Sequence, residues 1–169
     1  MRGKSVLIWI FCLLGATKIA GAQVLMKPNE KLIFSFQTKQ GKRAVLVKDS
    51  PDRYLVYRYG NSKQAEFVYP SVLDSSSWSL FRYSWYLRGG GKQNDGLDLN
   101  YVQFAHGDTK YVLYETYSAS DDQTQVGIRI IPLMKGEAVD MPGLKRSRRG
   151  TLIDLRDAEF IGHSEEQFD

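Results

Sequence analysis

The sequence predicts an all-β fold, a single antiparallel barrel or sandwich of about eight strands. Short segments rich in β-branched and aromatic residues recur at intervals of about 8–14 residues, and turn residues separate them. No segment between Gln23 and Lys135 has helical periodicity over three turns. Because hairpin-like links join consecutive segments, and because a closed sheet has no exposed edges, an up-and-down meander closed into a barrel is preferred.

Four strands are expected between residues 31 and 69. Alternation in the first of them places Leu32, Phe34 and Phe36 on one face. A strong turn follows the second strand at residues 49–52, where Pro51 presets φ and the Asp and Ser side chains bond the local backbone. The expected strands of this half span residues 31–38, 43–48, 53–59 and 64–69.

Four more strands are expected between residues 78 and 134. The first of these, Trp78–Leu87, has Phe81, Tyr83 and Trp85 on its inward face and a row of aromatic and arginine residues on the other. The next two strands form a hairpin, since Gly107-Asp108 favours a two-residue turn. The expected strands of this half span residues 78–87, 97–106, 109–118 and 125–134.

The chain after Met134 has a different, irregular pattern. It contains a basic run, Lys145–Arg149, which we expect to be a solvated loop or, alternatively, a site for anionic polymers. Thr151–Leu155 is short and apolar and could form a ninth strand. Residues 158–169 end acidic, and we expect them to form a mobile tail.

The first 22 residues have the pattern of a cleaved secretory signal peptide. Basic residues precede an apolar run from Val6 to Leu14, and small residues at Ala20 and Ala22 suit a signal peptidase. The run is too short to be a stable membrane anchor. We therefore expect cleavage after Ala22 and a periplasmic or secreted location. The predicted organisation is a signal peptide at 1–22, a single β-domain at 23–157 and the acidic tail at 158–169.

Composition narrows the range of functions. The full chain has 23 basic and 19 acidic residues, and three of the basic residues lie in the predicted signal, so the exported part has a net charge of about +1. Such a charge gives no support for a nucleic-acid partner. The only cysteine, Cys12, also lies in the signal, so the exported part has no disulfide or thiolate ligand. His106 and His163 lack an evident third ligand, and we predict no metal, no cofactor and no catalytic residue.

The candidate binding residues belong to the fifth strand and the glycine-rich loop after it. Tyr, Trp and Arg are enriched at protein–protein hot spots, and successive glycines allow unusual backbone conformations and close approach of a partner. We therefore predict an exported, non-enzymatic domain that binds another protein as an inhibitor, an immunity factor or an envelope-interaction domain. Alternatively, both faces of this strand are buried between two layers. The predicted contact residues are Trp78, Arg82, Tyr86, Arg88, Gly89, Gly90, Gly91 and Asn94.

The overall plan, a signal peptide followed by a small tyrosine-rich antiparallel barrel, is similar to that of bacterial periplasmic lysozyme inhibitors. The likeness is one of architecture, because the Ser-Gly-x-x-Tyr element and the cysteines of one such inhibitor group are absent. No residue role is carried over from it.

Two other functions stay open at this point. The interior or mouth of the barrel could hold a small ligand or a glycan. A hydrolase would need two carboxylates in one cleft, for which Glu66, Asp98 and Glu115 are the candidates.

Overall fold

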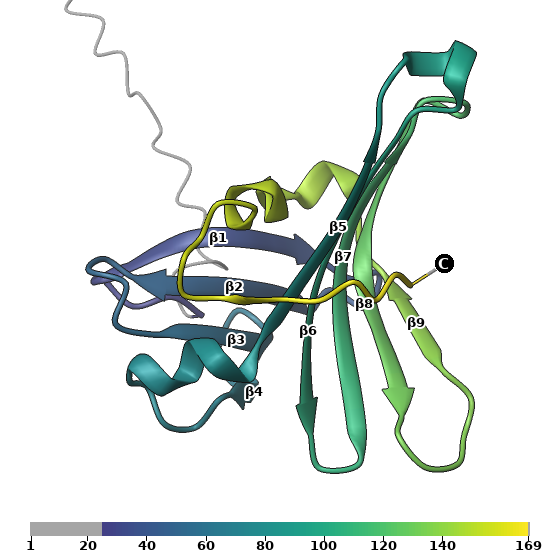
Figure 1. The fold of residues 1–169 in the computed structure, drawn as a ribbon. Helices are drawn as coiled ribbons and strands as arrows, with labels where there is room; N and C mark the ends of the chain where they lie inside the picture. Colours follow the sequence, from purple (N-terminus) through teal and green to yellow (C-terminus); the bar gives the residue numbers. More distant parts are fainter. Residues whose placement is uncertain (1–24, 169) are drawn as a thin grey trace, which may run out of the picture.

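Two sheets pack against each other in the computed structural model, which describes residues 25–168 (Figure 1). The first sheet has the strand order β10-β1-β2-β3-β4, and the second has the order β11-β5-β6-β7-β8-β9. The predicted all-β class is confirmed in its sandwich form, whereas the preferred closed barrel is wrong. The predicted signal peptide lies outside the described residues. The strands are β1 (Glu30–Gln37), β2 (Arg43–Asp49), β3 (Leu55–Gly60), β4 (Ala65–Tyr69), β5 (Arg82–Arg88), β6 (Leu97–His106), β7 (Thr109–Ser118), β8 (Gln123–Pro132), β9 (Val139–Pro142), β10 (Arg149–Gly150) and β11 (Gly162–His163).

The link between β4 and β5 separates the two sheets. It contains a short helix, η1 (Ser75–Leu80), whose first turn is capped by Asp74: the carboxylate accepts a hydrogen bond from the N–H of Ser76 at 2.9 Å. The chain thereby leaves the edge of the first sheet, and β4 and β5 are not neighbours in either sheet. The fifth strand begins at Arg82 instead of Trp78 for the same reason. Within each sheet, consecutive strands are neighbours as a meander predicts.

The β6–β7 hairpin has the bounds that the sequence predicts. The two strands pair along their whole length, from Leu97 opposite Ser118 to His106 opposite Thr109. The turn between them is therefore the two-residue Gly107-Asp108 link, in which Gly107 has a φ of 58°. This hairpin is the centre of the second sheet.

The inward row of β5 ends earlier than predicted. Tyr83 and the preceding Phe81 are fully buried. Trp85, which we expected inside with them, is 44% exposed. Figure 1 shows the end of β5 projecting beyond the first sheet. The ring of Trp85 instead lies under the guanidinium of Arg156, 4.8 Å from the ring centre.

The main core lies between the two sheets. Phe34 and Phe36 of β1 point into it, with ring centres 5.7 Å apart. Leu152 and Leu155 enter it from η4 (Leu152–Leu155), so the segment that could have been a ninth strand is a short helix. Each such side chain stabilises the fold by roughly 1.5–3 kcal/mol when fully buried.

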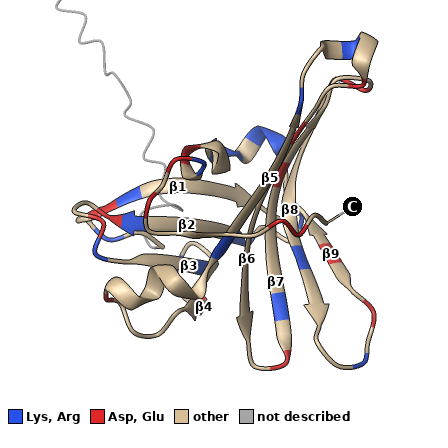
Figure 2. Cartoon of the chain, viewed as in Figure 1, with Lys and Arg blue, Asp and Glu red and all other residues tan. Residues whose placement is uncertain are grey.

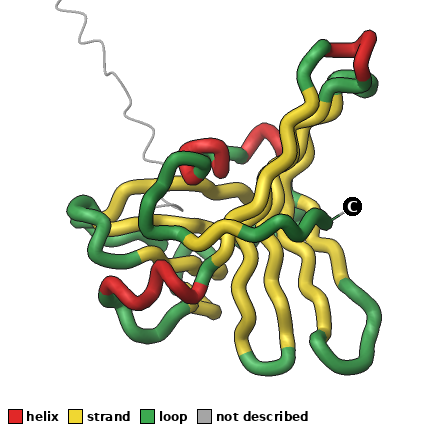
Figure 3. Tube along the Cα trace, viewed as in Figure 1, coloured by secondary structure: helices red, strands yellow, loops and turns green. Residues whose placement is uncertain are grey.

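Helical structure in the described part of the chain is confined to four short segments (Figure 3). The two not yet mentioned are η2 (Gly91–Asn94) and η3 (Lys145–Ser147). The latter lies in the basic run, where Lys145 and Arg146 are exposed. No helix within residues 25–168 is both long and apolar enough to cross a membrane.

The chain after β8 connects the two sheets. It pairs as β9 with β8 in the second sheet, then as β10 with β1 in the first, and returns as β11, a parallel neighbour of β5. The segment that we expected to be a mobile tail packs on the fold in part: Ile161 is 3% exposed, and the ring centre of Phe160 lies 5.9 Å from that of Trp78.

A buried carboxylate holds this connecting segment in place. Glu115 of β7 is 4% exposed and forms an ion pair with Arg148. Its Oε2 also accepts hydrogen bonds from the Thr151 hydroxyl at 2.9 Å and from the Leu152 N–H at 2.6 Å. Charge-assisted hydrogen bonds of this kind are stronger than neutral ones.

A second buried ion pair fixes the far side of the first sheet. The two terminal nitrogens of Arg58 donate to the two carboxylate oxygens of Glu30 at 2.6 and 2.7 Å. Tyr54 and the N–H of Lys27 donate to the same carboxylate. Burial alone would raise the pKa of Glu30, but these hydrogen bonds, led by those of Arg58, outweigh it, and the pKa lies below its ordinary value.

We expect Glu30→Gln to lower the free energy of unfolding by about 3 kcal/mol at neutral pH, because the Arg58 guanidinium is then buried without its counter-charge. Since the folded-state pKa of Glu30 is depressed, the stabilisation is present above the unfolded-state pKa and is lost as the pH falls through the folded-state pKa. The difference between wild type and variant should therefore shrink on acidification. Urea unfolding at a series of pH values measures it.

The matched control for this experiment is Glu66→Gln. Glu66 pairs with Lys42 at the surface, and the side chains of both residues are more than a quarter exposed. Exposed ion pairs contribute little to stability, so the unfolding midpoint should hardly move. Equal effects of the two substitutions would contradict the assigned role of Glu30.

Candidate binding site

The face of the second sheet that is turned away from the first sheet carries its own cluster of side chains. We call it the outer face; it consists of the residues of β5 to β9 that alternate with the inward-pointing ones. Tyr101, Val112 and Tyr114 are buried on it, at 3%, 0% and 9% exposure. Strands with apolar residues on both faces are unusual in a sheet with one solvated side. The outer face therefore requires an explanation beyond core packing.

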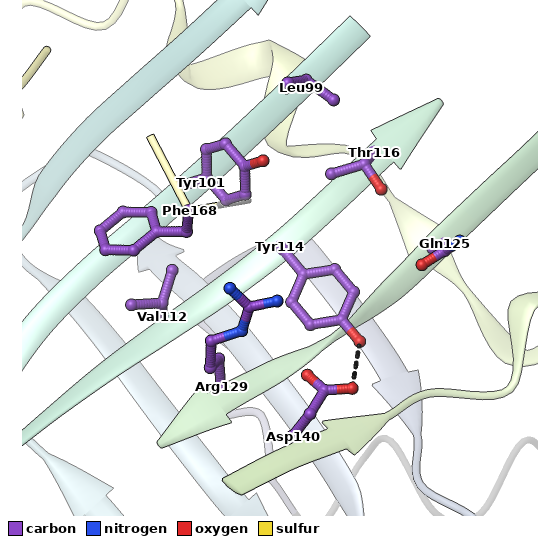
Figure 4. A pocket seen from close by; sticks show the side chains of 9 residues that line it. All are labelled: Leu99, Tyr101, Val112, Tyr114, Thr116, Gln125, Arg129, Asp140 and Phe168. Carbon is purple, nitrogen blue, oxygen red and sulfur yellow. Dashed lines mark hydrogen bonds between the residues drawn. The ribbon is translucent and has the colours of Figure 1, made fainter. Parts of the chain in front are cut away.

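A pocket of about 230 Å³ opens on this face (Figure 4). Four strands and the C-terminal end of the described chain contribute to it. Tyrosine, arginine and aspartate side chains lie beside aliphatic ones in its wall, so it offers both polar and apolar contacts. The lining residues are Leu99, Tyr101, Val112, Tyr114, Thr116, Gln125, Arg129, Asp140 and Phe168.

The polar side of the pocket is formed by neighbouring strands. The hydroxyl of Tyr114 donates a hydrogen bond to Asp140 at 3.2 Å, and Asp140 lies opposite Arg129 in the β8–β9 pair (Figure 4). Burial raises the pKa of the Tyr114 phenol far above its ordinary value, and the nearby Asp140 carboxylate adds to the rise. The phenol therefore stays a neutral hydrogen-bond donor at physiological pH.

Gly127 makes room for the Tyr114 ring. It lies directly opposite Tyr114 in the β7–β8 pair, and a Cβ built at this position would come 2.2 Å from the Tyr114 oxygen. The ring thus rests on the bare backbone of the neighbouring strand. The position of one wall of the pocket depends on this glycine.

Three of the predicted contact residues belong to the outer face. Arg82, Tyr86 and Arg88 alternate with the inward Tyr83, and Tyr86 lies opposite Leu99 of the pocket wall. The side chain of Arg82 donates to the carbonyl of Ser79 at 2.9 Å and is exposed. Arg82 and Tyr86 therefore lie on the pocket-bearing face, whereas the Arg88 side chain donates to the carbonyl of Asp95 in the glycine-rich loop.

Trp78 is not on this surface, and its predicted contact role is wrong. It is 3% exposed, and its indole N–H donates to the carbonyl of Asp52 at 2.9 Å. The reason is η1, which turns Trp78 into the core instead of extending β5.

The glycine-rich loop lies away from the pocket, at the tip of a long projection formed by the ends of β5–β8 (Figures 1 and 3). Gly90 and Gly91 have φ angles of 95° and 60°, which favour glycine. The amide of Asn94 donates to the carbonyl of Gly89, and Ser120 of the neighbouring turn donates to Asp95. The loop is thus closed by its own hydrogen bonds. The contact role of Gly89, Gly90, Gly91 and Asn94 stays a prediction.

The three candidate carboxylates of the hydrolase hypothesis each have a basic partner. Glu66 pairs with Lys42, Asp98 with Arg156, and Glu115 with Arg148. Asp98 and Asn100 together hold Arg156 against the sheet. The geometry thus explains Asp98 and Glu115 as anchors of the C-terminal segment. Within residues 25–168, no group of three or more His, Cys, Asp or Glu side chains is arranged to hold a metal ion.

A second, apolar pocket of about 190 Å³ lies between the sheets. Aromatic and aliphatic side chains of both sheets surround it, which is the arrangement that an interior ligand site would need. Its lining residues are Tyr57, Tyr59, Phe67, Tyr111, Ile128, Ile130 and Met141.

The residues of the outer-face pocket were not among those predicted from the sequence. Tyr101, Tyr114, Arg129 and Asp140 lie on four different strands, and only the register of those strands brings them together. A signal did exist, because β6 and β7 each carry large apolar residues on both faces. Phe168, by contrast, stands alone among polar and acidic residues, so no apolar pattern in the sequence marks it as part of a pocket.

Comparison of the chain with protein-family models, with curated proteins and with solved structures finds no match. Function is therefore inferred from the geometry of the outer face.

Charged residues of both signs are interspersed over the described chain, and the C-terminal segment carries acidic residues where it crosses the second sheet (Figure 2).

We expect Gly127→Ala to lower stability by about 1–3 kcal/mol, because the new methyl group forces the Tyr114 ring out of its position. Near-UV circular dichroism should change with it, since the environment of a buried tyrosine changes. The control is Gly89→Ala, where nothing lies within 4 Å of the added Cβ. Thermal unfolding of both variants measures the difference. Similar midpoints for the two would show that Tyr114 does not rest on Gly127.

Proposed function

We propose that this chain is an exported, non-enzymatic β-domain that binds another protein through the outer face of its second sheet. The proposal is carried by the aromatic side chains of the outer face and by the pocket among them, which is lined by Tyr114, Arg129 and Asp140. Arg82, which is exposed, and Tyr86, which is partly exposed, lie on the same face. Tyrosine and arginine are enriched where proteins bind proteins, since they combine large contact area with hydrogen bonding.

The small volume of this pocket suits side chains of a protein partner better than a whole small molecule, although a wider hollow of about 580 Å³ is lined by Arg82, Gln103 and Lys110 among others. Pockets for small molecules usually have volumes of about 300–1,000 Å³ and enclose most of the ligand, whereas the outer-face pocket has about 230 Å³. Such a volume suits one or two side chains of a partner. The surrounding strands offer the wider contact area that a protein interface needs.

The test is co-purification of a partner from fractionated extracts of the producing cells, with cross-linking to identify it. Arg82→Ala combined with Tyr86→Ala should weaken binding at least about thirtyfold, because even one hot-spot truncation costs about 2 kcal/mol. The matched control is Lys31→Ala combined with Lys39→Ala, an exposed residue of β1 and an exposed residue of the turn that follows it. Binding that survives the first pair unchanged would overturn the proposal.

A small apolar ligand is the second candidate, supported by the pocket between the sheets. Its wall consists of Tyr57, Phe67, Tyr111 and the other side chains named above, and most of the wall surface is apolar. A compound of a few carbon atoms fits about 190 Å³. Binding here would leave the outer face free.

We expect the purified protein from its natural host to begin at Gln23, because export removes the signal peptide after Ala22. Intact-mass spectrometry measures the start of the chain, and a native spectrum of the same sample shows any ligand held between the sheets. The variant Ala22→Arg should keep the full-length mass, since signal peptidase requires a small residue there. A full-length wild-type protein would exclude a cleaved signal.

A further inference from the structure

The last described residues lie across the outer face itself. The chain pairs with β5 through β11 and then continues over the neighbouring strands (Figure 1, yellow). The N–H of Ser164 donates to the carbonyl of Tyr83 at 2.8 Å, which starts this crossing. Residues 164–168 therefore occupy part of the surface that the proposed function assigns to a partner.

Two side chains attach this segment to the sheet. The ring of Phe168 meets that of Tyr101 edge-on, with ring centres 5.4 Å apart, and joins the cluster of Tyr101, Val112 and Tyr114. The ammonium group of Lys110 lies 2.7 Å from the carboxylate of Glu166. The same ammonium group is 5.5 Å from the centre of the Phe168 ring.

These contacts are specific in chemistry but modest in strength. The side chains of Lys110 and Glu166 are 24% and 44% exposed, and ion pairs at such positions contribute little to stability. Phe168 is only partly buried. Another segment could replace contacts of this strength, whereas Ile161, a few residues earlier, is buried in the core.

We propose that Tyr101, Val112 and Lys110 form a recognition site for an extended segment of the partner protein that carries an aromatic side chain two residues after a carboxylate. The chain's own Glu166 and Phe168 occupy this site when no partner is bound. The proposal rests on the function proposed above and names the chemistry that the outer face recognises.

The remaining pocket shows where a partner segment would continue. Phe168 forms one wall, and the space beyond it leads to Tyr114, Arg129 and Asp140 (Figure 4). A longer segment that replaces Phe168 would continue along this wall, where the Tyr114 hydroxyl already donates to Asp140.

The test uses the full chain with Phe168→Ala and a synthetic peptide with the sequence of residues 163–169, followed by NMR titration into the millimolar range. The peptide should shift the signals of Tyr101, Val112 and Lys110 and bind the variant about tenfold more tightly than wild type, because the internal competitor is weakened. Phe160→Ala, another aromatic of the C-terminal segment, should behave as wild type. No shift in the Phe168→Ala protein, or equal affinity in both proteins, would overturn the proposal.

Charge exchange tests the role of Lys110. In the Phe168→Ala protein, Lys110→Glu should weaken binding of the peptide about fivefold. A peptide with lysine at the position of Glu166 should restore it. Failure of both effects would remove Lys110 from the site.

Two further outcomes separate this inference from the proposed function. If a captured partner depends on Arg82 and Tyr86 but is unaffected by Phe168→Ala and Lys110→Glu, the recognition site is wrong and the proposed function stands. If the peptide binds as expected but no partner is captured, the proposed function fails instead.

A concentration-dependent dimer that Phe168→Ala abolishes would identify the occupant as a second copy of the chain and overturn the assignment to a different partner.

Discussion

The carboxylate of Glu115 is the interaction on which the assembled fold depends. It is buried on the inward side of β7, where an unpaired charge would cost several kcal/mol. Its donors, Arg148, Thr151 and Leu152, come from a segment far along the chain. That segment also pairs with β1 in the first sheet and sends Leu152 and Leu155 into the core between the sheets. The sandwich is therefore complete only when the C-terminal part of the chain has docked, and the path of this segment determines what reaches the outer face.

The features that sequence reasoning predicted correctly depend on neighbouring residues. The hairpin of β6 and β7 has the expected bounds because alternation and a two-residue turn are local signals. The closed barrel was wrong because closure depends on whether the first and last strands meet, which no local pattern determines. Trp78 and Trp85 show the same limit: an Asp-capped helix turns Trp78 inward, and Trp85 stays 44% exposed with its ring against Arg156. Glu115 could have faced either side from its sequence alone, since its partners are more than 30 residues away.

The candidate site divides in the same way. Arg82, Tyr86 and Arg88 share a face of one strand, so alternation alone predicts their common orientation. Tyr114, Arg129 and Asp140 belong to three strands, and their meeting requires the correct register of two strand pairs. The glycine-rich loop attracted attention through its composition, but its glycines serve a tight, self-bonded turn at the tip of the projection. The glycine content correctly predicted an unusual backbone conformation in this loop. The pocket, by contrast, lies among strand residues of ordinary composition, which only the pairing of the strands brings together.

Phe168 covers part of the outer face, whereas other residues hold the two sheets together. Phe168, which forms one wall of the pocket, follows the last strand and belongs to neither sheet, while β6 and β7 fix the side chains that it touches. If the proposed function holds, substitutions at Glu166 and Phe168 would change how strongly this segment competes with a partner, while the buried contacts that join the two sheets stay as they are.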